Sequence, residues 1–296
     1  MKALRTPDAR FENLPGYDFE PHYVDIDELR MHYVDEGPRD GNVVLLLHGE
    51  PSWSYLYRHM IPPLRDAGFR VIAPDLIGFG KSDKPVDKGG YSYAGHVVWM
   101  ASFIEALQLQ EITLFCQDWG SLIGLRVAAE NEQLFARIAL GNGGMPTGDQ
   151  EMPKAFLTWQ KFARFSPWFP IGKLIQKATT TELSDAIVAA YDAPFPSAKY
   201  KAAARAFPLL VPTSPDDPAS EANRAAWRVF KKWQKPFLTT FSNRDPITRG
   251  GEKVWQEGVP GAKGLNHVRI LNGGHFLQED KGAELAEVLI RFVTET

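Results

Sequence analysis

The residue best placed to do chemistry in this sequence is Asp118, at the centre of the string Cys-Gln-Asp-Trp-Gly over 116–120. A β-rich run at 111–115 precedes this string, and a helical pattern over 121–130 follows it. Small residues two places before and two places after the centre are typical of the tight strand-to-helix turn that presents a nucleophile, usually seen as G-x-S-x-G. We therefore predict that Asp118 is the nucleophile of such a turn.

An aspartate at this position changes the chemistry from that of a serine. A serine hydroxyl needs a base before it can attack, whereas a carboxylate is already anionic at neutral pH. Asp118 can displace a leaving group from saturated carbon and form an ester with the substrate. The alternative is that Asp118 only caps the helix that begins near Ser121, since Asp is common at helix N-termini. That alternative would make the strand, the small flanking residues and the partners described next coincidental.

His275 is the histidine best placed to activate the water that hydrolyses this ester. It lies in Asn-Gly-Gly-His-Phe over 272–276, directly after a predicted strand at 267–271. The two glycines suit a tight loop that presents one imidazole, and in this topology the base comes last in the chain, after the acid. The histidines that we assign to packing, surface or turn roles are His22, His32, His59, His96 and His267.

Asp245 is the predicted acid that orients His275. It follows the predicted strand at 236–241, and its alternative role is that of a turn carboxylate before Pro246. A second possible position for the acid follows the strand that ends near Leu140. Asn142 stands there and cannot carry the charge, which favours Asp245.

The loop His-Gly-Glu-Pro at 48–51 follows an apolar run at 43–47. In this topology a backbone N–H of that loop and the N–H of the residue after the nucleophile form the oxyanion hole. We therefore predict the backbone amides of Glu50 and Trp119 as its donors. We assign His48 a structural role in the loop.

Together these residues resemble the haloalkane dehalogenases. The matching strings are HGEPSW at 48–53, DLIGFGKSD at 75–83, QDWG at 117–120, GHF at 274–276, RTPD at 5–8 and YDAPFP at 191–196. The resemblance covers nearly the whole chain and is closest to the subfamily in which the acid follows the later strand, as Asp245 does. In another subfamily an Asn follows the His-Gly pair and helps to hold the halide, whereas Glu50 stands here.

The resemblance implies hydrolysis of carbon–halogen bonds, with a small halogenated hydrocarbon as substrate and a halide ion as product. Displacement builds negative charge on the halide, and an indole N–H donates without accepting. Trp119 is one halide-binding donor by this resemblance, and Trp159 occupies the matching place for the second. Trp168 is the nearby rival for that role, and core packing is the alternative role for either tryptophan. Substrate length is expected to depend on cap side chains that include Phe156, Phe162, Phe165 and Phe207.

The order of elements predicts an α/β-hydrolase fold, with a mostly parallel central sheet flanked by helices and an inserted helical cap. Strand-like runs and helical stretches alternate through the first half of the chain, which implies a parallel sheet with right-handed crossovers. These segments are strands at 43–47, 70–73 and 111–115 and helices at 93–107 and 121–130.

The strand signal nearly disappears between about residues 145 and 230, where helical patches occur at 155–165 and 182–191. It returns at 236–241 and 267–271, and a predicted helix at 283–293 closes the chain. We therefore predict a core formed by residues 1–145 and 230–296 and a helical cap formed by residues 146–229.

Three other functions compete with this interpretation: two enzymatic activities and one non-catalytic binding role. An epoxide hydrolase would use the same nucleophile with cap tyrosines as acids, and Tyr191 and Tyr200 lie in the predicted cap. Trp159 and the string EPSW at 50–53 favour a halide leaving group instead. A fluoroacetate-type dehalogenase would be expected to have an arginine where Trp119 stands. A non-catalytic binding protein of the same fold would not need the complete set of nucleophile, base and acid.

Composition bounds the remaining possibilities. The net charge of −3, with both signs spread along the chain, predicts no nucleic-acid partner and no membrane-binding face. The first 13 residues lack an apolar segment, so we expect no signal peptide and a cytoplasmic protein. The single cysteine, Cys116, and the absence of His/Asp/Glu spacing for a metal predict neither a metal nor a cofactor. The string GFGKS at 78–82 lacks the first glycine of a phosphate loop, since Asp75 stands there, and the acidic pair Asp216-Asp217 is expected to be solvated.

Overall fold

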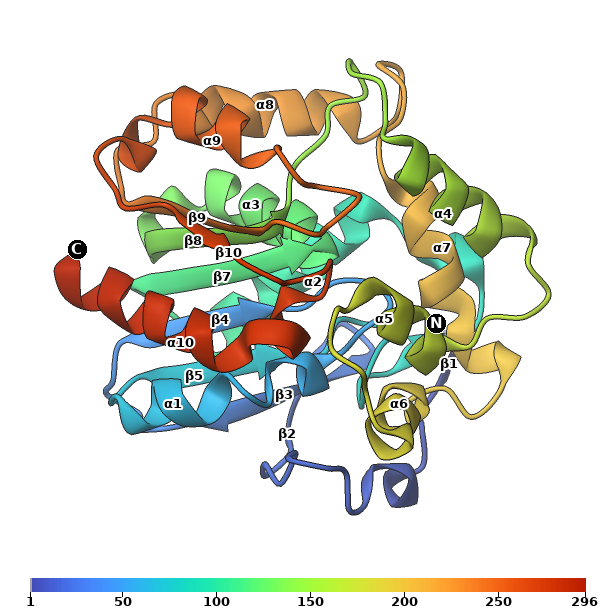
Figure 1. Ribbon diagram of the computed structural model, residues 1–296. Helices are drawn as coiled ribbons and strands as arrows, with labels where there is room; N and C mark the ends of the chain where they lie inside the picture. The colour runs from blue at the N-terminus through green and yellow to red at the C-terminus, as the bar shows by residue number, and fades with distance from the viewer. Residues whose placement is uncertain (1) are drawn as a thin grey trace.

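An eight-stranded sheet forms the centre of the computed structural model, which describes residues 2–296 (Figure 1). Met1, the first residue of the predicted core, lies outside the described residues. From one edge of the sheet to the other, the strands are β10 (Val268–Ile270), β9 (Phe237–Ser242), β8 (Phe135–Gly143), β7 (Ile112–Asp118), β4 (Val43–Leu47), β5 (Arg70–Pro74), β3 (Leu29–Glu36) and β2 (His22–Ile26). The strands from β10 to β5 run parallel, and β3 and β2 are antiparallel. A separate antiparallel pair joins β1 (Ala3–Leu4) and β6 (Lys84–Pro85).

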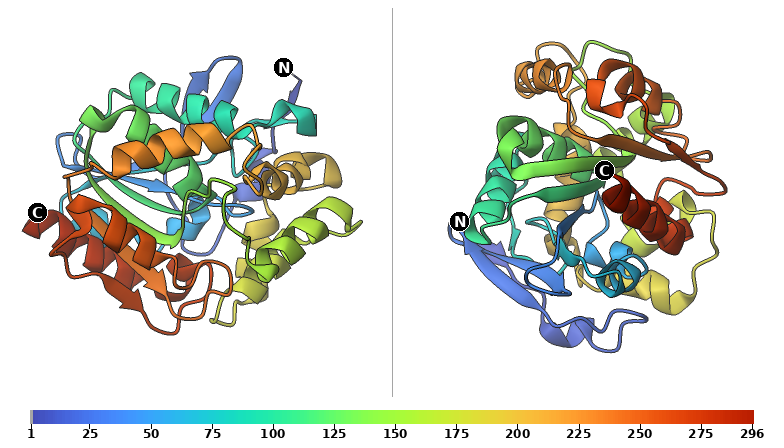
Figure 2. Two further views of the ribbon diagram at one scale, coloured as in Figure 1. Left: turned by 90° about the horizontal axis from the view of Figure 1, so that it is seen from above. Right: turned by 90° about the vertical axis from the view of Figure 1, so that its left-hand side faces the viewer.

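Helices cover both faces of this sheet, as the two views of Figure 2 show. The helices are α1 (Ile61–Asp66), α2 (Tyr93–Ala106), α3 (Trp119–Glu130), α4 (Lys154–Phe165), α5 (Ile171–Ala178), α6 (Asp185–Asp192), α7 (Ala202–Leu210), α8 (Ser220–Phe230), α9 (Glu252–Gly258) and α10 (Leu277–Glu295). Helices α2, α3 and α8 pack on one face, and α1 and α10 pack together on the other. Every residue of β4 is buried, because a parallel strand covered on both faces has no solvent side. The predicted parallel sheet with flanking helices is therefore confirmed.

The last helix begins earlier than the sequence pattern predicts. The expected start was near residue 283, whereas α10 begins at Leu277 and bends at Lys281, whose φ of −143° and ψ of 34° are not helical. The extra first turn is held by burial, since Leu277, Gln278 and Glu279 pack into the core. Within residues 2–296, none of the helices combines the length and the apolar character needed to cross a membrane.

The helices α4 to α7 follow β8 in the chain and lie beyond the carboxyl ends of the parallel strands, on the right-hand side of Figure 1. Helices α4 and α7 pack against each other, as do α5 and α6. A buried polar cluster links Tyr191 on α6 to Arg58, which follows the 3₁₀ turn Ser54–Tyr57, and to Glu279 on α10. Both terminal nitrogens of Arg58 donate to the carboxylate of Glu279 at 2.6 Å, and the hydroxyl of Tyr191 donates to the same carboxylate.

Removing the arginine of this cluster should be costly, because it leaves a buried carboxylate without its cation. The side chains of Arg58 and Glu279 are only 1% and 2% exposed. We expect Arg58→Ala to lower the free energy of unfolding by about 3–5 kcal/mol, measured by urea titration. The matched control is Arg65→Ala, whose side chain is 39% exposed and pairs at the surface, and it should cost about 0–1 kcal/mol. Equal losses in the two variants would contradict a structural role for the buried pair.

Candidate active site

Asp118 sits at a sharp turn between β7 and α3, with a φ of 49° and a ψ of −128°. A positive φ is strained for a residue with a side chain and is tolerated where the surroundings enforce it. Two neighbouring glycines make room for this turn. A Cβ at Gly120 would lie 2.0 Å from the carbonyl oxygen of Leu47, and a Cβ at Gly49 would lie 2.3 Å from Oδ1 of Asp118. The turn therefore needs both glycines to hold the carboxylate above the carboxyl edge of the sheet.

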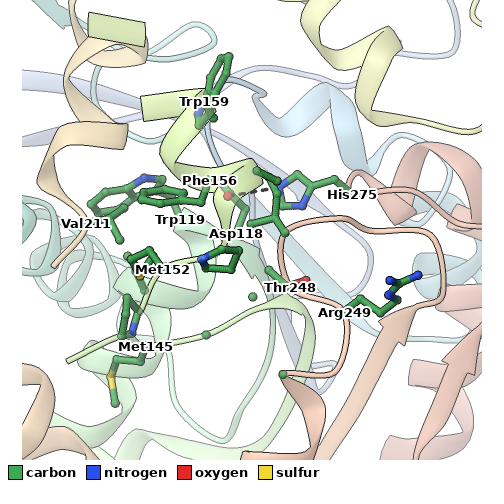
Figure 3. A pocket seen from close by; sticks show the side chains of 18 of the residues that line it. Asp118, Trp119, Met145, Met152, Phe156, Trp159, Val211, Thr248, Arg249 and His275 are labelled. Carbon is green, nitrogen blue, oxygen red and sulfur yellow. Dashed lines mark hydrogen bonds and ion pairs between the residues drawn. The ribbon is translucent and has the colours of Figure 1, made fainter. Parts of the chain in front are cut away.

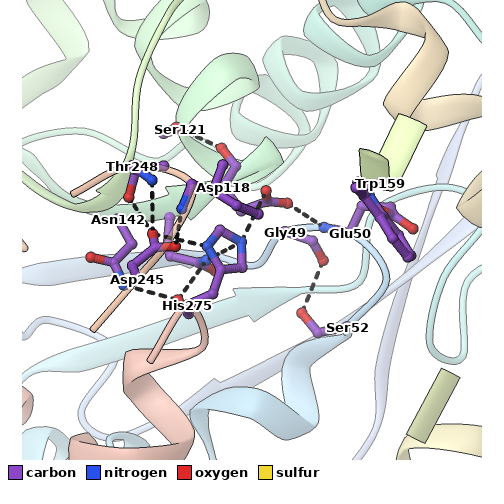
Figure 4. A network of polar contacts seen from close by, with 12 residues as sticks. Gly49, Glu50, Ser52, Asp118, Ser121, Asn142, Trp159, Asp245, Thr248 and His275 are labelled. Atoms are coloured by element: carbon purple, nitrogen blue, oxygen red, sulfur yellow. Dashed lines mark hydrogen bonds and ion pairs between the residues drawn. The ribbon is translucent and has the colours of Figure 1, made fainter. Parts of the chain in front are cut away.

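The two oxygens of the Asp118 carboxylate have different partners (Figure 4). The backbone N–H of Glu50 donates to Oδ1 at 2.7 Å. Nε2 of His275 lies 3.3 Å from Oδ2, and Nδ1 of His275 lies 3.0 Å from Oδ2 of Asp245. The structure thus brings Asp118 together with His275 and Asp245, which lie more than a hundred residues later in the chain, in one hydrogen-bonded row.

Electrostatics within this row hold a proton on the imidazole. Burial of His275 disfavours its charged form, but the charge of Asp245 and the hydrogen bond to Asp118 outweigh burial and raise the pKa of His275 to about 10. Burial of Asp245 likewise opposes its ionisation, but His275 and the donors Thr248 and Ile247 lower the pKa of Asp245 to about 2. The imidazole is therefore poised between two carboxylates, and its proton affinity depends on the charge of both.

Several residues that support the row escaped the sequence reasoning. The side-chain amide of Asn142 donates to the carbonyl oxygens of Gly274 at 2.8 Å and His275 at 3.0 Å. The amide of Gln117 also donates to the carbonyl oxygen of His275, at 3.1 Å. The hydroxyl of Thr248 donates to the Asp245 carboxylate. Asn142 occupies the position where the sequence offers an alternative site for the acid, and its polar side chain at the end of a strand is the one local signal for its role.

The loop that carries His275 is also held from the side of α5. The N–H of His275 donates to the carbonyl oxygen of Ala178 at 2.7 Å. A Cβ at Gly274 would lie 2.4 Å from that same oxygen, so glycine is required there for close approach rather than for a positive φ. The positive φ of this loop belongs to Asn272, at 59°.

A cavity of about 1270 Å³ opens above Asp118 (Figure 3). Trp119, from the first turn of α3, and Trp159, from α4, line the cavity together with Asp118 and His275. Trp168 is 64% exposed and is not among the lining residues. Of the two candidates for a second indole donor, the structure therefore places Trp159, and not Trp168, in the cavity.

The two cavity tryptophans are held in different ways. The ring of Trp119 is buried and packs against Phe207 and Tyr93, with ring centroids 4.6 Å and 5.3 Å away. Trp159 stacks on Phe162, and its indole N–H donates to Oε2 of Glu50 at 3.2 Å. Glu50 therefore contributes two groups to the site: its backbone N–H to Asp118 and its side chain to Trp159.

The expectation for the cap phenylalanines is only half right. Phe156 and Phe162 line the cavity, as predicted. Phe165 is wrong as a lining residue, because it lies at the end of α4 with its side chain turned outward and 72% exposed. Phe207 is also wrong, because it is fully buried behind the Trp119 ring and supports that ring rather than the substrate space.

His48 holds the loop that carries Glu50 in place. Nε2 of His48 accepts the N–H of Leu76 at 2.9 Å, and Nδ1 lies 2.9 Å from the carbonyl oxygen of Gly49. These bonds tie the loop that carries Glu50 to the segment after β5, which is a structural role. Within residues 2–296, no group of three or more His, Cys, Asp or Glu side chains is arranged to hold a metal ion.

The chain is similar over nearly its whole length to known proteins. Residues 42–282 match the alpha/beta hydrolase fold family, so the predicted fold is confirmed. A haloalkane dehalogenase of Psychrobacter cryohalolentis is 58% identical over 298 residues, which cover 99% of this chain and 98% of the relative. A haloalkane dehalogenase of Mycobacterium marinum is 56% identical, covering 98% of this chain and 99% of the relative. The solved tetrameric structure of haloalkane dehalogenase DpaA from Paraglaciecola agarilytica is 36% identical, with a TM-score of 0.90 and coverage of 97% of both chains.

Proposed function

Because the chain belongs to the haloalkane dehalogenases, as its motifs predict, we propose that it hydrolyses the carbon–halogen bond of small haloalkanes to an alcohol and a halide ion. The observation that carries this proposal is the Asp118 carboxylate on its strained turn, with His275 3.3 Å from one of its oxygens. An anionic nucleophile beside a base suits formation and hydrolysis of an ester at saturated carbon.

The first step is displacement of the halide. Oδ1 of Asp118 is held by the N–H of Glu50, which leaves Oδ2 to attack the carbon that bears the halogen. The new C–O bond forms as the C–halogen bond breaks, and the halogen leaves with the bonding electrons. The indole N–H groups of Trp119 and Trp159 are the proposed donors to the departing halide, because both residues line the cavity above Asp118 and an indole N–H donates without accepting.

The second step is hydrolysis of the ester by water. Once Asp118 is esterified, its negative charge and its hydrogen bond no longer raise the pKa of His275. The pKa of the imidazole therefore falls, His275 releases its proton to solvent, and Nε2 becomes free to take a proton from the attacking water. Asp245 stabilises the imidazolium that results. The oxyanion formed at Oδ1 meets the N–H of Glu50, and we propose the N–H of Trp119 as its second donor. As the oxyanion collapses, the acyl C–Oδ2 bond breaks, the imidazolium of His275 protonates the departing alkoxide to give the alcohol, and the new Asp118 carboxyl group loses its proton to the imidazole.

Two further parts of this proposal concern the setting of the reaction. We propose that residues 146–229 form a cap over a core of residues 1–145 and 230–296, supported by the position of Trp159 on α4 above Asp118. We also retain a cytoplasmic location, without a nucleic-acid or membrane partner and without a metal or cofactor, as predictions from composition.

The epoxide hydrolase alternative is disfavoured by the cap tyrosines. The hydroxyl of Tyr191 is buried and donates to Glu279. In the described part of the chain, neither Tyr191, nor Tyr200, nor any other tyrosine lines the cavity above Asp118. An opening epoxide would then lack the phenol that supplies a proton to the alkoxide.

Substrate assays test the proposal directly. We expect the purified protein to release bromide from 1-bromobutane and 1,2-dibromoethane and to leave styrene oxide unchanged. Bromide release is followed by ion chromatography and diol formation by gas chromatography. Diol formation from styrene oxide without bromide release from either haloalkane would overturn the proposed function.

The halide donors predict a second result. Trp119→Phe keeps an aromatic ring against Phe207 but removes the N–H, so we expect kcat for 1-bromobutane to fall by about 10²–10³-fold, as when one oxyanion-hole donor is lost. Trp159→Phe should give a loss of the same kind. Trp168→Phe is the matched control, since this indole is exposed, and should keep wild-type activity. A control that loses as much as Trp119→Phe would show that the N–H groups of the cavity are not the donors.

A further inference from the structure

Glu50 carries a buried carboxyl group that the proposed reaction does not use. The residue is 4% exposed. Oε2 accepts the indole N–H of Trp159 at 3.2 Å, while Oε1 is buried without a hydrogen-bond partner among the described residues. In residues 2–296, no lysine or arginine forms an ion pair with it. A buried charge without a cation is costly, so the surroundings of Glu50 suit a neutral acid.

On balance the surroundings of Glu50 raise the pKa of its carboxyl group. Burial raises the pKa of the Glu50 carboxyl well above its ordinary value, and the charge of Asp118 on β7 raises it further. The hydrogen bond from Trp159 on α4 and the charge of His275, on the loop after β10, lower the pKa by less. Burial and the charge of Asp118 therefore favour the neutral, protonated form of the Glu50 side chain.

The contact with Glu50 occupies the N–H that the halide needs. A departing halide and Oε2 of Glu50 compete for the indole N–H of Trp159. A neutral carboxyl oxygen is a weak competitor, whereas a hydrogen bond to an ionised acceptor is roughly twice as strong. An ionised Glu50 would also place a second negative charge beside Asp118, next to the anion that must bind.

We propose that Glu50 is a positioning residue whose proton controls the halide site: the neutral acid holds Trp159 ready and yields its N–H to the halide, and the carboxylate retains that N–H and repels the anion. This inference rests on the proposed function of Trp159 as a halide donor. It predicts that halide binding is lost at high pH because of a group outside the row formed by Asp118, His275 and Asp245.

Bromide binding measures this effect without turnover. The bromide Kd is obtained from quenching of tryptophan fluorescence between about pH 5 and pH 10 in the wild type and in Glu50→Gln. Glutamine has the same shape, can accept the N–H of Trp159 through its carbonyl oxygen, and does not ionise. Above the pKa of Glu50 we expect the wild-type Kd to weaken by up to about tenfold per pH unit more than that of the variant, because one proton is linked to binding. Both proteins keep His275, whereas only the wild type carries an ionisable side chain at position 50.

Thermal unfolding gives a readout independent of halide. Unfolded Glu50 ionises near its ordinary pKa, whereas the raised pKa in the folded protein retains the proton to higher pH, so stability falls as pH rises above the ordinary pKa. Glu50→Gln removes this loss. We therefore expect its Tm to rise relative to that of the wild type as pH increases from about 5 to about 8.

The outcomes separate this inference from the proposed function. Equal pH slopes of the bromide Kd in the two proteins, with binding intact, would overturn the role of Glu50 and leave the dehalogenase proposal standing. If bromide does not bind to either protein at any pH, the proposed halide site itself is wrong. Should Glu50→Gln fail to fold, Glu50→Met supplies another uncharged side chain of similar length and should show the same loss of pH dependence. Trp168→Phe reports quenching of an exposed indole that does not depend on the site.

Discussion

A His275→Phe variant is expected to release one bromide ion per protein molecule from 1,2-dibromoethane and then to stop. Asp118 can still attack, because its carboxylate needs no base, but water is no longer activated to hydrolyse the ester. Turnover should fall by about 10⁴–10⁶-fold, the range seen when a hydrolase loses its general base. Rapid-mix bromide measurement gives the burst, and mass spectrometry of proteolytic peptides locates the added alkyl group on Asp118.

His22→Phe is the matched control for this experiment. His22 lies on the edge strand β2, and its ring packs against Tyr33, a contact that phenylalanine can keep. The control should turn over at the wild-type rate without accumulating an adduct. Steady turnover in His275→Phe, or a burst with the alkyl group on another residue, would contradict the assignment of base and nucleophile.

An Asp118→Asn variant is expected to lose halide release altogether, by about 10⁴-fold or more, with neither a burst nor an adduct. The amide is nearly isosteric with the carboxylate, and its oxygen can still accept the N–H of Glu50. Asparagine also tolerates a positive φ, so the turn should keep its shape. The loss would therefore come from the missing anionic nucleophile and not from a damaged fold. Halide release and intact mass are measured on the same sample, because deamidation would restore the aspartate.

Asp216→Asn is the matched control for this variant. Asp216 is an exposed aspartate in the turn before α8, and it is remote from Asp118 in the sequence. It should leave both halide release and Tm unchanged. If Asp118→Asn, with its amide intact by mass, keeps activity within tenfold of Asp216→Asn, Asp118 is not the nucleophile.

The row of nucleophile, base and acid was predictable because each member follows a strand. Asp118, His275 and Asp245 were each chosen from a local pattern of apolar run, turn and polar residue. Parallel strands present their carboxyl ends at one edge of the sheet, so residues that follow such strands meet without further information. The geometry places all three within hydrogen-bonding distance, as this argument expects.

The parts of the fold that escaped prediction lack such a local pattern or depend on burial. The hairpin of β2 and β3 turns at Asp27, which has a φ of 55° and is not flanked by a glycine that would mark the turn. The first turn of α10 forms because Glu279 is held by Arg58, which lies 221 residues earlier in the chain. A pattern read over a short window contains neither of these causes.

Sequence alone determined what chemistry is available: an aspartate on a nucleophile turn, a late histidine with an acid, and a family in which these residues break carbon–halogen bonds. Residue type and position relative to a strand suffice for this, because the sheet supplies the rest of the geometry. Tertiary structure decided which side chains face the cavity and which support it. It turns Phe165 outward, places Phe207 behind Trp119, and gives the N–H of Trp159 to Glu50. These outcomes depend on how helices α4 and α7 rotate as they pack against each other and on the loop after β4. The exposure and the hydrogen-bond partner of a side chain are defined only after those elements have packed together.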